Sequence, residues 1–209
     1  MPAAKPTASL SLDLDNLWSY MKTHGDLGWE TFPSYLDLVV PRILEFLRAR
    51  NLTITFFVVG QDAALEKNQP ALKLLAAAGH EIGNHTITHP CSKNFAFISE
   101  NNRRGLEEMT LDDIEAEIVE AGRRIRDAIP EQGAMSYGYT CYQPFVGRGA
   151  TRQSYVPVVA KHCVAGRGKG ERPNDARYCD LWYLWSTPCE RMTGAELVGL
   201  AEQAAAPQH

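Results

Sequence analysis

The sequence lacks the markers of several protein classes. No pair of its five cysteines has C-x-x-C spacing, which argues against a zinc ribbon or a redox dithiol. There is no dense basic stretch and the net charge is -4, so neither nucleic acid nor an anionic membrane is expected as a partner. No apolar run is long enough to cross a bilayer, and we therefore expect no membrane span.

The N-terminal residues also lack the apolar segment of a signal peptide, so we expect a cytoplasmic protein. The odd number of cysteines gives no sign of a disulfide framework, and we expect free thiols that are buried or half-buried. These cysteines are Cys91, Cys141, Cys163, Cys179 and Cys189.

Strand and helix patterns alternate along the first 130 residues. Residues 8–15 alternate apolar and polar side chains, which predicts a strand with one wet face. Thr110 and Asp113 have the spacing of a helix-starting capping box. The order predicts parallel strands joined by crossover helices. The expected strands are 8–15, 53–59 and 80–83, and the expected helices are 33–50, 70–78 and 110–129.

The later part of the chain is less regular. We predict strands over 134–139 and 180–186 and helices over 155–164 and 193–205. The glycine-rich run 166–170 predicts a flexible loop, and Trp182 and Trp185 are expected in the core. No repeat or linker divides the chain, so residues 1–209 are expected to form a single domain.

Two carboxylates mark the end of the first predicted strand. Asp13 and Asp15 are two residues apart, so their side chains point to the same side. Ligand sites in parallel α/β sheets form at the carboxyl ends of strands. Two like charges this close need a nearby cation or a raised pKa. A D-x-D sequence alone is usually only a solvated or capping pair.

A histidine pair follows the third predicted strand. His85 and His89 are four residues apart, but Gly83 and Pro90 flank them and argue for a loop rather than a helix. No glutamate follows His85, so the zinc-protease motif is absent. One carboxylate with two imidazoles would leave coordination positions open, as in a catalytic metal site. The second carboxylate could then act as a base.

These segments together resemble the polysaccharide deacetylase family, also called the NodB-homology or carbohydrate esterase 4 group. The resemblance rests on residues 11–16, 55–60 and above all 79–90. It implies an α/β fold, a distorted (β/α) barrel of the NodB-homology type. By the same resemblance Asp13 is the catalytic base. Asp15, His85 and His89 would be ligands of a divalent metal ion, typically zinc.

Two stretches depart from the family pattern. The third family motif carries an arginine that steadies the catalytic aspartate, but residues 136–147 contain none, and Arg148 is the expected substitute. Tyr139 is expected to line the site by the same resemblance. Trp18 either packs under a long loop or stacks on a sugar face.

The family also ends in a strand that carries a general-acid histidine. No matching segment is present, so we expect a C-terminally incomplete domain that lacks this strand. The sheet edge left open would favour a homo-oligomer.

The leading hypothesis is a metal-dependent hydrolase of C–N amide bonds that deacetylates an N-acetylated sugar or polysaccharide. A small amide such as a cyclic imide is the alternative substrate. A second hypothesis is a relative that keeps the metal but is not catalytic. A third, a sugar-nucleotide transferase that uses the D-x-D pair, gives no role to His85 and His89.

Overall fold

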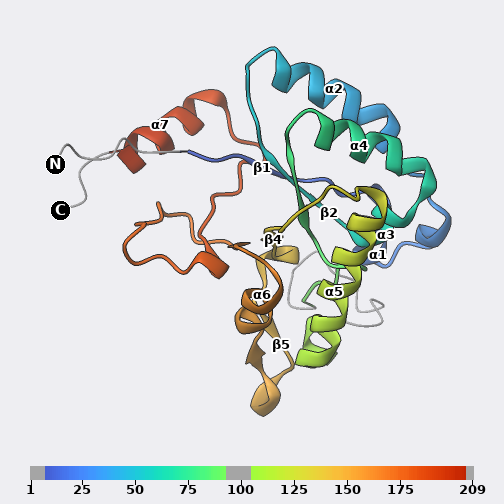
Figure 1. Cartoon of the computed structure of the whole chain (residues 1–209). Helices are drawn as coiled ribbons and strands as arrows, with labels where there is room; N and C mark the ends of the chain where they lie inside the picture. Colours follow the sequence, from blue (N-terminus) through green and yellow to red (C-terminus); the bar gives the residue numbers. More distant parts are fainter. Residues whose placement is uncertain (1–7, 93–104, 206–209) are drawn as a thin grey trace.

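A parallel β-sheet lies at the centre of the computed structural model, which describes residues 8–92 and 105–205 (Figure 1). Within these residues the sheet has the strand order β1-β2-β3-β4-β7, with every neighbouring pair parallel. Its strands are Ser11–Asp13 (β1), Thr55–Val58 (β2), Glu81–Asn84 (β3), Tyr137–Gly138 (β4) and Gly166–Arg167 (β7). The sheet curls into a half-barrel, so the predicted α/β fold class is confirmed.

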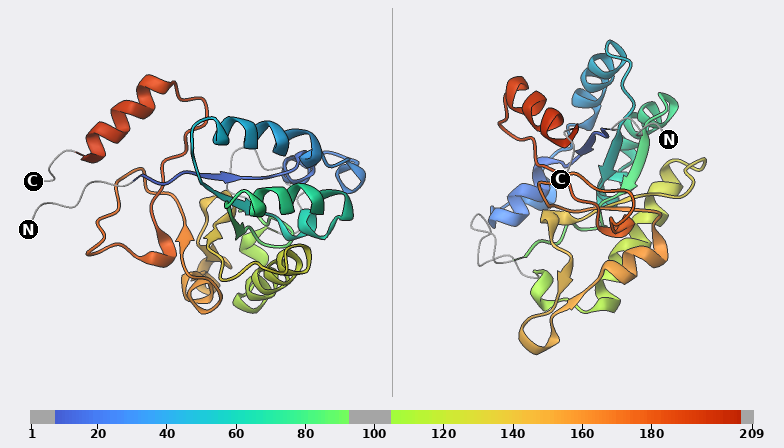
Figure 2. Two further views of the ribbon diagram at one scale, coloured as in Figure 1. Left: turned by 45° about the horizontal axis from the view of Figure 1, so that its top comes forward. Right: turned by 90° about the vertical axis from the view of Figure 1, so that its left-hand side faces the viewer.

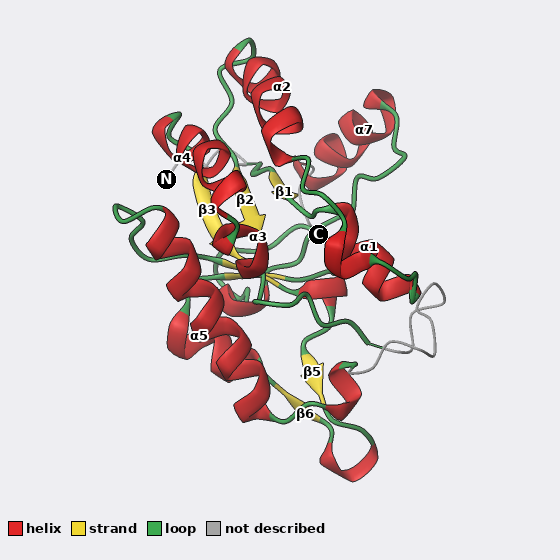
Figure 3. Ribbon diagram, turned by 90° about the vertical axis from the view of Figure 1, so that its right-hand side faces the viewer, coloured by secondary structure: helices red, strands yellow, loops and turns green. Residues whose placement is uncertain are grey.

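Helices cover the outer face of this sheet, and a short antiparallel hairpin extends beyond it (Figures 1 and 3). The hairpin consists of Phe145–Val146 (β5) and Gln153–Ser154 (β6). The α-helices are Leu17–His24 (α1), Leu36–Arg48 (α2), Gly60–Ala64 (α3), Gln69–Ala77 (α4), Leu111–Ala128 (α5), Val156–His162 (α6) and Gly194–Ala205 (α7). Every helix predicted from the sequence is present, with its ends shifted by a few residues.

The core forms between the sheet and α2, α4 and α5. Phe56 of β2 and Ile82 of β3 are fully buried there. The helices contribute apolar side chains at helical spacing, such as Leu72 and Leu75 of α4. A second cluster of buried side chains, which includes Tyr137 and the apolar face of α6, supports the end of the sheet near β4 and β7.

The start of α5 follows the predicted capping box. The Thr110 side chain accepts a hydrogen bond from the backbone N–H of Asp113, and the Asp113 carboxylate accepts from the Thr110 backbone. Both bonds satisfy N–H groups that a helix start leaves without partners. This start fixes where α5 begins and therefore which of its residues face the sheet.

Three predictions for the later chain are wrong. Residues 180–186 form a 3-10 helix, Leu181–Tyr183 (η6), and a single bridge from Leu184 to Arg167 instead of a strand. Trp185 is 43% exposed, not in the core. The glycine-rich run at 166–170 begins with strand β7 (166–167), and only 168–170 lack regular secondary structure, as predicted. Gly166 packs too closely against the Trp182 carbonyl for any larger residue.

The cysteine prediction is also wrong for one pair. Cys91 and Cys141 form a disulfide, whereas Cys163, Cys179 and Cys189 are free in the described part of the chain. The two bonded cysteines are 50 residues apart, and each follows a strand of the sheet, β3 or β4. Their loops meet because parallel strands end at the same edge.

The edge strand β1 and the C-terminal helix α7 are less well buried than the rest of the fold. β1 is an edge strand, and Leu10 just before it is 54% exposed, so the predicted apolar face of this strand is only partly buried. Helix α7 lies on the outside and buries none of its residues (Figure 2). Among the helices described, none combines the length and apolar character needed to cross a bilayer.

The core packing gives a stability prediction. Leu72→Ala removes a fully buried side chain of α4 and should lower the free energy of unfolding by about 2–5 kcal/mol. Leu74→Ala is the matched control, because Leu74 lies on the same helix but is 51% exposed, and its effect should stay within about 0.5 kcal/mol. Urea denaturation of the two variants measures the difference. Equal losses would mean that α4 does not pack as described.

Candidate metal centre

Four side chains predicted from the sequence lie together at the carboxyl ends of β1 and β3. Asp13 ends β1, Asp15 follows two residues later, and His85 comes directly after β3. His85 Nε2 lies 3.9 Å from Asp13 Oδ2 and 3.8 Å from Asp15 Oδ1. His89 Nε2 lies 3.6 Å from Asp15 Oδ2. The strand β2 between β1 and β3 sets this spacing.

The hydrogen bonds of His85 indicate which ring nitrogen carries the proton. Its Nδ1 lies 2.7 Å from the backbone carbonyl of Gly138, which only accepts, so Nδ1 is the donor. In a neutral ring Nε2 then has a lone pair directed at the two aspartates. Neither His85 Nε2 nor Asp15 Oδ1, both buried, has a hydrogen-bond partner among the described residues.

Burial sets the charge state of these groups. It raises the pKa of Asp15 to about 7, against the opposing effect of His85. It lowers the pKa of His89 to about 4 and also lowers the pKa of His85. Both imidazoles are therefore neutral near pH 7, which is the form that binds metal ions.

The donor set fits a divalent metal ion. One nitrogen or oxygen from each of Asp15, His85 and His89 can be chosen so that all three lie within 4.8 Å of one another. Ligand atoms around a single tetrahedral zinc ion are roughly 3–3.5 Å apart, slightly closer than the separations found here. A bound cation would also be a partner for His85 Nε2 and Asp15 Oδ1, the two buried atoms of this site without a hydrogen bond.

The loop that carries both histidines has a strained backbone. Thr86 has φ 62° and His89 has φ 53°, a region that β-branched and bulky residues rarely adopt. The Thr86 backbone N–H donates to Asn84 Oδ1 (2.9 Å), and the His89 backbone N–H donates to Thr86 Oγ1 (3.1 Å). These bonds hold His89 in the orientation that faces Asp15.

Glu117 of α5 binds the same loop from the other side. Its Oε2 accepts the backbone N–H groups of Ile87 (3.1 Å) and Thr88 (2.8 Å), and its Oε1 accepts the Thr88 hydroxyl (2.9 Å). The Lys22 ammonium donates to the Thr88 carbonyl at 2.6 Å. The sequence analysis missed Glu117, which links the histidine loop to a long, well-capped helix.

Arg167 is the second residue that was missed. Its guanidinium forms an ion pair and hydrogen bond with Asp13 Oδ1. The side chain passes over Gly138, where an added Cβ would lie 3.0 Å from Arg167 Nη2 and 3.0 Å from His85 Nδ1. Gly138 thus lets Arg167 and His85 approach together. An arginine beside Asp13 was expected at position 148, but the structure provides it from β7.

Three other predicted site residues lie elsewhere. Trp18 is buried, and its indole N–H donates to Asp62 Oδ1 (2.8 Å) behind the site. Tyr139 is fully buried, with its hydroxyl donating to the Trp182 carbonyl (2.7 Å). Arg148 is exposed in the turn between β5 and β6. The structure therefore brings none of these three side chains to the aspartates and histidines, and their role in substrate binding remains a prediction.

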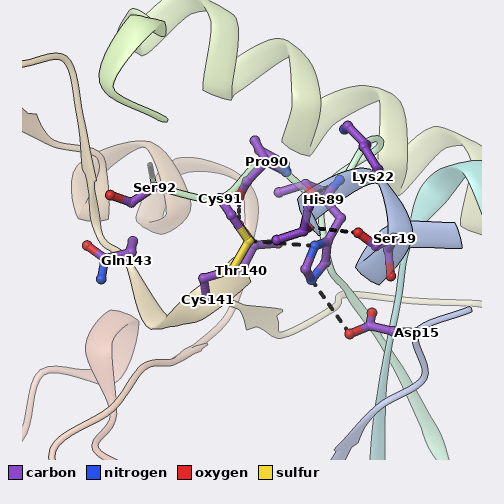
Figure 4. Close-up of a disulfide and its surroundings, with 12 residues drawn as sticks. Asp15, Ser19, Lys22, His89, Pro90, Cys91, Ser92, Thr140, Cys141 and Gln143 are labelled. Atoms are coloured by element: carbon purple, nitrogen blue, oxygen red, sulfur yellow. Dashed lines mark hydrogen bonds and ion pairs between the residues drawn. A yellow bond between two sulfur atoms is a disulfide. The ribbon is translucent and has the colours of Figure 1, made fainter. Parts of the chain in front are cut away.

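The disulfide lies beside His89 in the histidine loop (Figure 4). Cys91 Sγ is 3.8 Å from His89 Nδ1, on the side of the ring opposite to the nitrogen that faces Asp15. The bond to Cys141 joins the histidine loop to the loop that follows β4. The position of His89 is therefore tied to two neighbouring strands.

The chain is similar in sequence to curated proteins that are named as deacetylases. It is 38% identical over 92 residues to a chitooligosaccharide deacetylase of Sinorhizobium fredii, covering 44% of this chain and 35% of that relative. It is 41% identical over 75 residues to a peptidoglycan-N-acetylglucosamine deacetylase of Bacillus cereus, covering 35% and 26%. The matched region thus spans about a third or less of these relatives' length.

The fold has a solved counterpart. A Mycobacterium smegmatis protein assigned to the polysaccharide deacetylases superimposes with a TM-score of 0.63 at 17% identity, covering 98% of this chain and 78% of the other. At this identity the likeness concerns the fold. The model of the polysaccharide deacetylase family matches residues 23–144, which is more than half of the chain. The chain therefore belongs to the polysaccharide deacetylase family.

Proposed function

We propose that the protein is a metal-dependent amidohydrolase that removes the acetyl group from an N-acetylated sugar. The observation that carries this proposal is the pair of buried imidazoles that face Asp15 with a second carboxylate, Asp13, beside them. Asp15, His85 and His89 would hold the metal ion, and zinc suits two nitrogen donors and one carboxylate. When bound, the ion would polarise the amide carbonyl and make water a better nucleophile.

Asp13 would be the general base. Its Oδ1 is paired with Arg167, so Oδ2, on the side of His85, is the oxygen that can accept the proton of the attacking water. The guanidinium keeps the carboxylate in one orientation through a charge-assisted hydrogen bond. The Arg167 guanidinium carbon itself lies 4.8 Å from the ring centroid of Phe57 and 5.2 Å from that of Tyr142.

The substrate class is inferred from the relatives, whose names specify chitooligosaccharides and peptidoglycan N-acetylglucosamine. An N-acetylated carbohydrate is therefore proposed ahead of a small amide such as a cyclic imide. Acetate release from N-acetylglucosamine oligomers, measured with and without zinc, tests the proposal. Zinc-independent release, or release only from imides, would contradict it.

A second candidate is a metal-binding relative without turnover. The observation in its favour is that two of the remaining histidines are engaged elsewhere. His80 accepts the backbone N–H of Ile54, and His162 pairs with Glu115. Neither is therefore placed to protonate a leaving amine beside Asp13. Tight zinc binding without acetate release from any oligomer would support this candidate.

Removal of either imidazole should abolish metal binding. His85→Ala and His89→Ala each delete one of three proposed ligands, so zinc retained after dialysis should fall from about one ion per chain to almost none. His80→Ala is the matched control and should keep its zinc, because the His80 ring lies before β3 and accepts the backbone N–H of Ile54, just before β2. Metal analysis of the purified variants decides this. Unchanged zinc in both histidine variants would show that the assignment is wrong.

Substitution of Asp13, the proposed base, or of its partner Arg167 should slow turnover without changing metal binding. Asp13→Asn should keep zinc and slow acetate release by about 10²–10⁴-fold, because the amide cannot take the proton. Arg167→Ala should slow it by about 10–100-fold, and Arg167→Lys should restore part of the loss by replacing the positive charge. Steady-state kinetics at saturating zinc measure both effects. Full activity in Arg167→Ala would exclude the positioning role.

Glu117 should act on metal affinity through the histidine loop. Glu117→Ala removes the acceptor of three hydrogen bonds to Ile87 and Thr88, and zinc affinity should fall by about 10–100-fold. Glu120→Ala is the control on the same helix, since Glu120 pairs only with exposed arginines. Competition with a chelator measures the affinities. If both variants bind zinc equally, the loop does not depend on Glu117.

A further inference from the structure

A second group of metal-binding side chains lies on the other side of His89. One ligand atom from each of Cys91, Cys141 and His89 lies within 4.8 Å of the other two. Cys91 Sγ is 3.8 Å from His89 Nδ1, whereas the other ring nitrogen, Nε2, faces Asp15 (Figure 4). Two thiolates and one imidazole are a donor set that zinc and other thiophilic cations prefer. The two sulfurs are joined in a disulfide, so reduction would make this donor set available.

The spacing of these atoms suits one shared ion. A sulfur and a nitrogen bound to the same tetrahedral zinc ion lie about 3.5 Å apart, and two sulfurs about 3.8 Å apart. The 3.8 Å between Cys91 Sγ and His89 Nδ1 is close to the first value. The Cα atoms of the two cysteines are 5.7 Å apart, so rotation about the Cα–Cβ bonds of the reduced cysteines can reach the second. Water would fill the fourth coordination position.

Other contacts hold the two cysteine loops together without the disulfide. The Thr140 hydroxyl donates to the Pro90 carbonyl at 2.6 Å, which joins the residues directly before the two cysteines. The Cys91 carbonyl accepts the backbone N–H of Leu106 at 3.0 Å. The strands β3 and β4, which precede these loops, pair with each other in the sheet. The two cysteines therefore stay near each other and near His89 after reduction.

A reductant can reach the disulfide through Cys141. This side chain is half-buried, whereas Cys91 is fully buried. A dithiol attacks Cys141 Sγ as its thiolate, and Cys91 leaves as a thiolate that takes up a proton. The second thiol of the reductant then displaces Cys141, so the reductant becomes a disulfide and the protein gains two thiols. When a divalent cation binds, each thiol gives one proton to water.

The ring of His89 can bind a metal ion through only one nitrogen at a time. A disulfide sulfur carries no hydrogen, so His89 Nδ1 is the donor toward Cys91 and the ring lone pair is on Nε2, facing Asp15. A neutral imidazole has a single lone pair on its two nitrogens. A cation on Nδ1 would place the proton on Nε2, and that nitrogen could then not bind an ion beside Asp15.

We propose that Cys91, Cys141 and His89 form a second metal site, present only in the reduced protein, for zinc or another thiophilic divalent cation. The existence of this site goes beyond the proposed function and does not depend on it. Its competition for His89 does rest on the metal centre proposed at Asp15. Reduction followed by metal binding would withdraw His89 from Asp15 and leave that centre with two protein ligands. The redox state of one disulfide would thus decide which site holds the ion.

A variant that lacks the first site isolates the second. The full-length His85→Ala chain is reduced with a phosphine, which is oxidised to its oxide with oxygen from water, and is then dialysed with zinc. Zinc content should rise from almost none in the oxidised variant to about one ion per chain in the reduced variant. Cobalt(II) in place of zinc should give a thiolate-to-cobalt charge-transfer absorption only after reduction. No zinc and no such absorption in the reduced variant would overturn the proposal.

Serine substitutions in the His85→Ala chain identify the ligands. Cys141→Ser should abolish both zinc binding and the absorption, and its half-buried position means that serine should not disturb the core. Cys179→Ser is the matched control and should keep both, because Cys179 is also half-buried but forms no disulfide. Unchanged zinc in the Cys141 variant, or loss of zinc in the Cys179 variant, would show that other residues bind the ion.

The unaltered protein tests the competition for His89. Reduction should leave its zinc content at about one ion per chain while the cobalt-loaded form gains the thiolate absorption. Two ions per chain would overturn the competition. If the oxidised protein releases no acetate but reduced His85→Ala binds zinc through its thiols, the second site stands and the deacetylase proposal fails. If the oxidised protein releases acetate and reduced His85→Ala binds no zinc, the deacetylase stands without the second site.

Discussion

The burial of one carboxylate next to another governs the architecture of this site. Asp15 is almost completely buried and its neighbour Asp13 is two residues away on the same side of the chain. Asp13 has Arg167 as a direct partner, whereas the buried Asp15 lies against the imidazoles of His85 and His89, whose pKa values burial lowers. A buried carboxylate without a cation is costly, and its raised pKa expresses that cost. A metal ion among these donors would remove it.

The two carboxylates can therefore have different roles. Both come from one strand end, but Arg167 engages Asp13, which is partly exposed to solvent. The loop after β3 supplies the two imidazoles around Asp15. Different environments for two similar groups are what allows one to bind a cation and the other to move a proton. The division depends on β7 as much as on β1, because β7 carries the arginine.

The parts of the site that local sequence patterns encode could be predicted, and the parts that depend on tertiary contact could not. Asp13, Asp15, His85 and His89 lie in short motifs at strand ends, and the order of strands and helices placed them together. Arg167 lies between glycines that suggested a flexible loop. Those glycines instead allow close packing, since a Cβ on Gly168 would lie 2.3 Å from the Tyr183 ring. That requirement is visible only once η6 is in place.

The disulfide also depends on tertiary contact and could not be predicted from the sequence. It helps to keep two loops with left-handed residues in place. An odd number of cysteines does not show that two of them, 50 residues apart, form a disulfide. These two cysteines come together only because β3 and β4 pair side by side in the sheet. In the folded protein the bond joins two loops that both contain left-handed residues, His89 on one side and Cys141 on the other. Strain in each loop would otherwise favour relaxation. A covalent link between them holds His89, a proposed metal ligand, at a fixed spacing from Tyr142, whose ring lies against the Arg167 that pairs with Asp13.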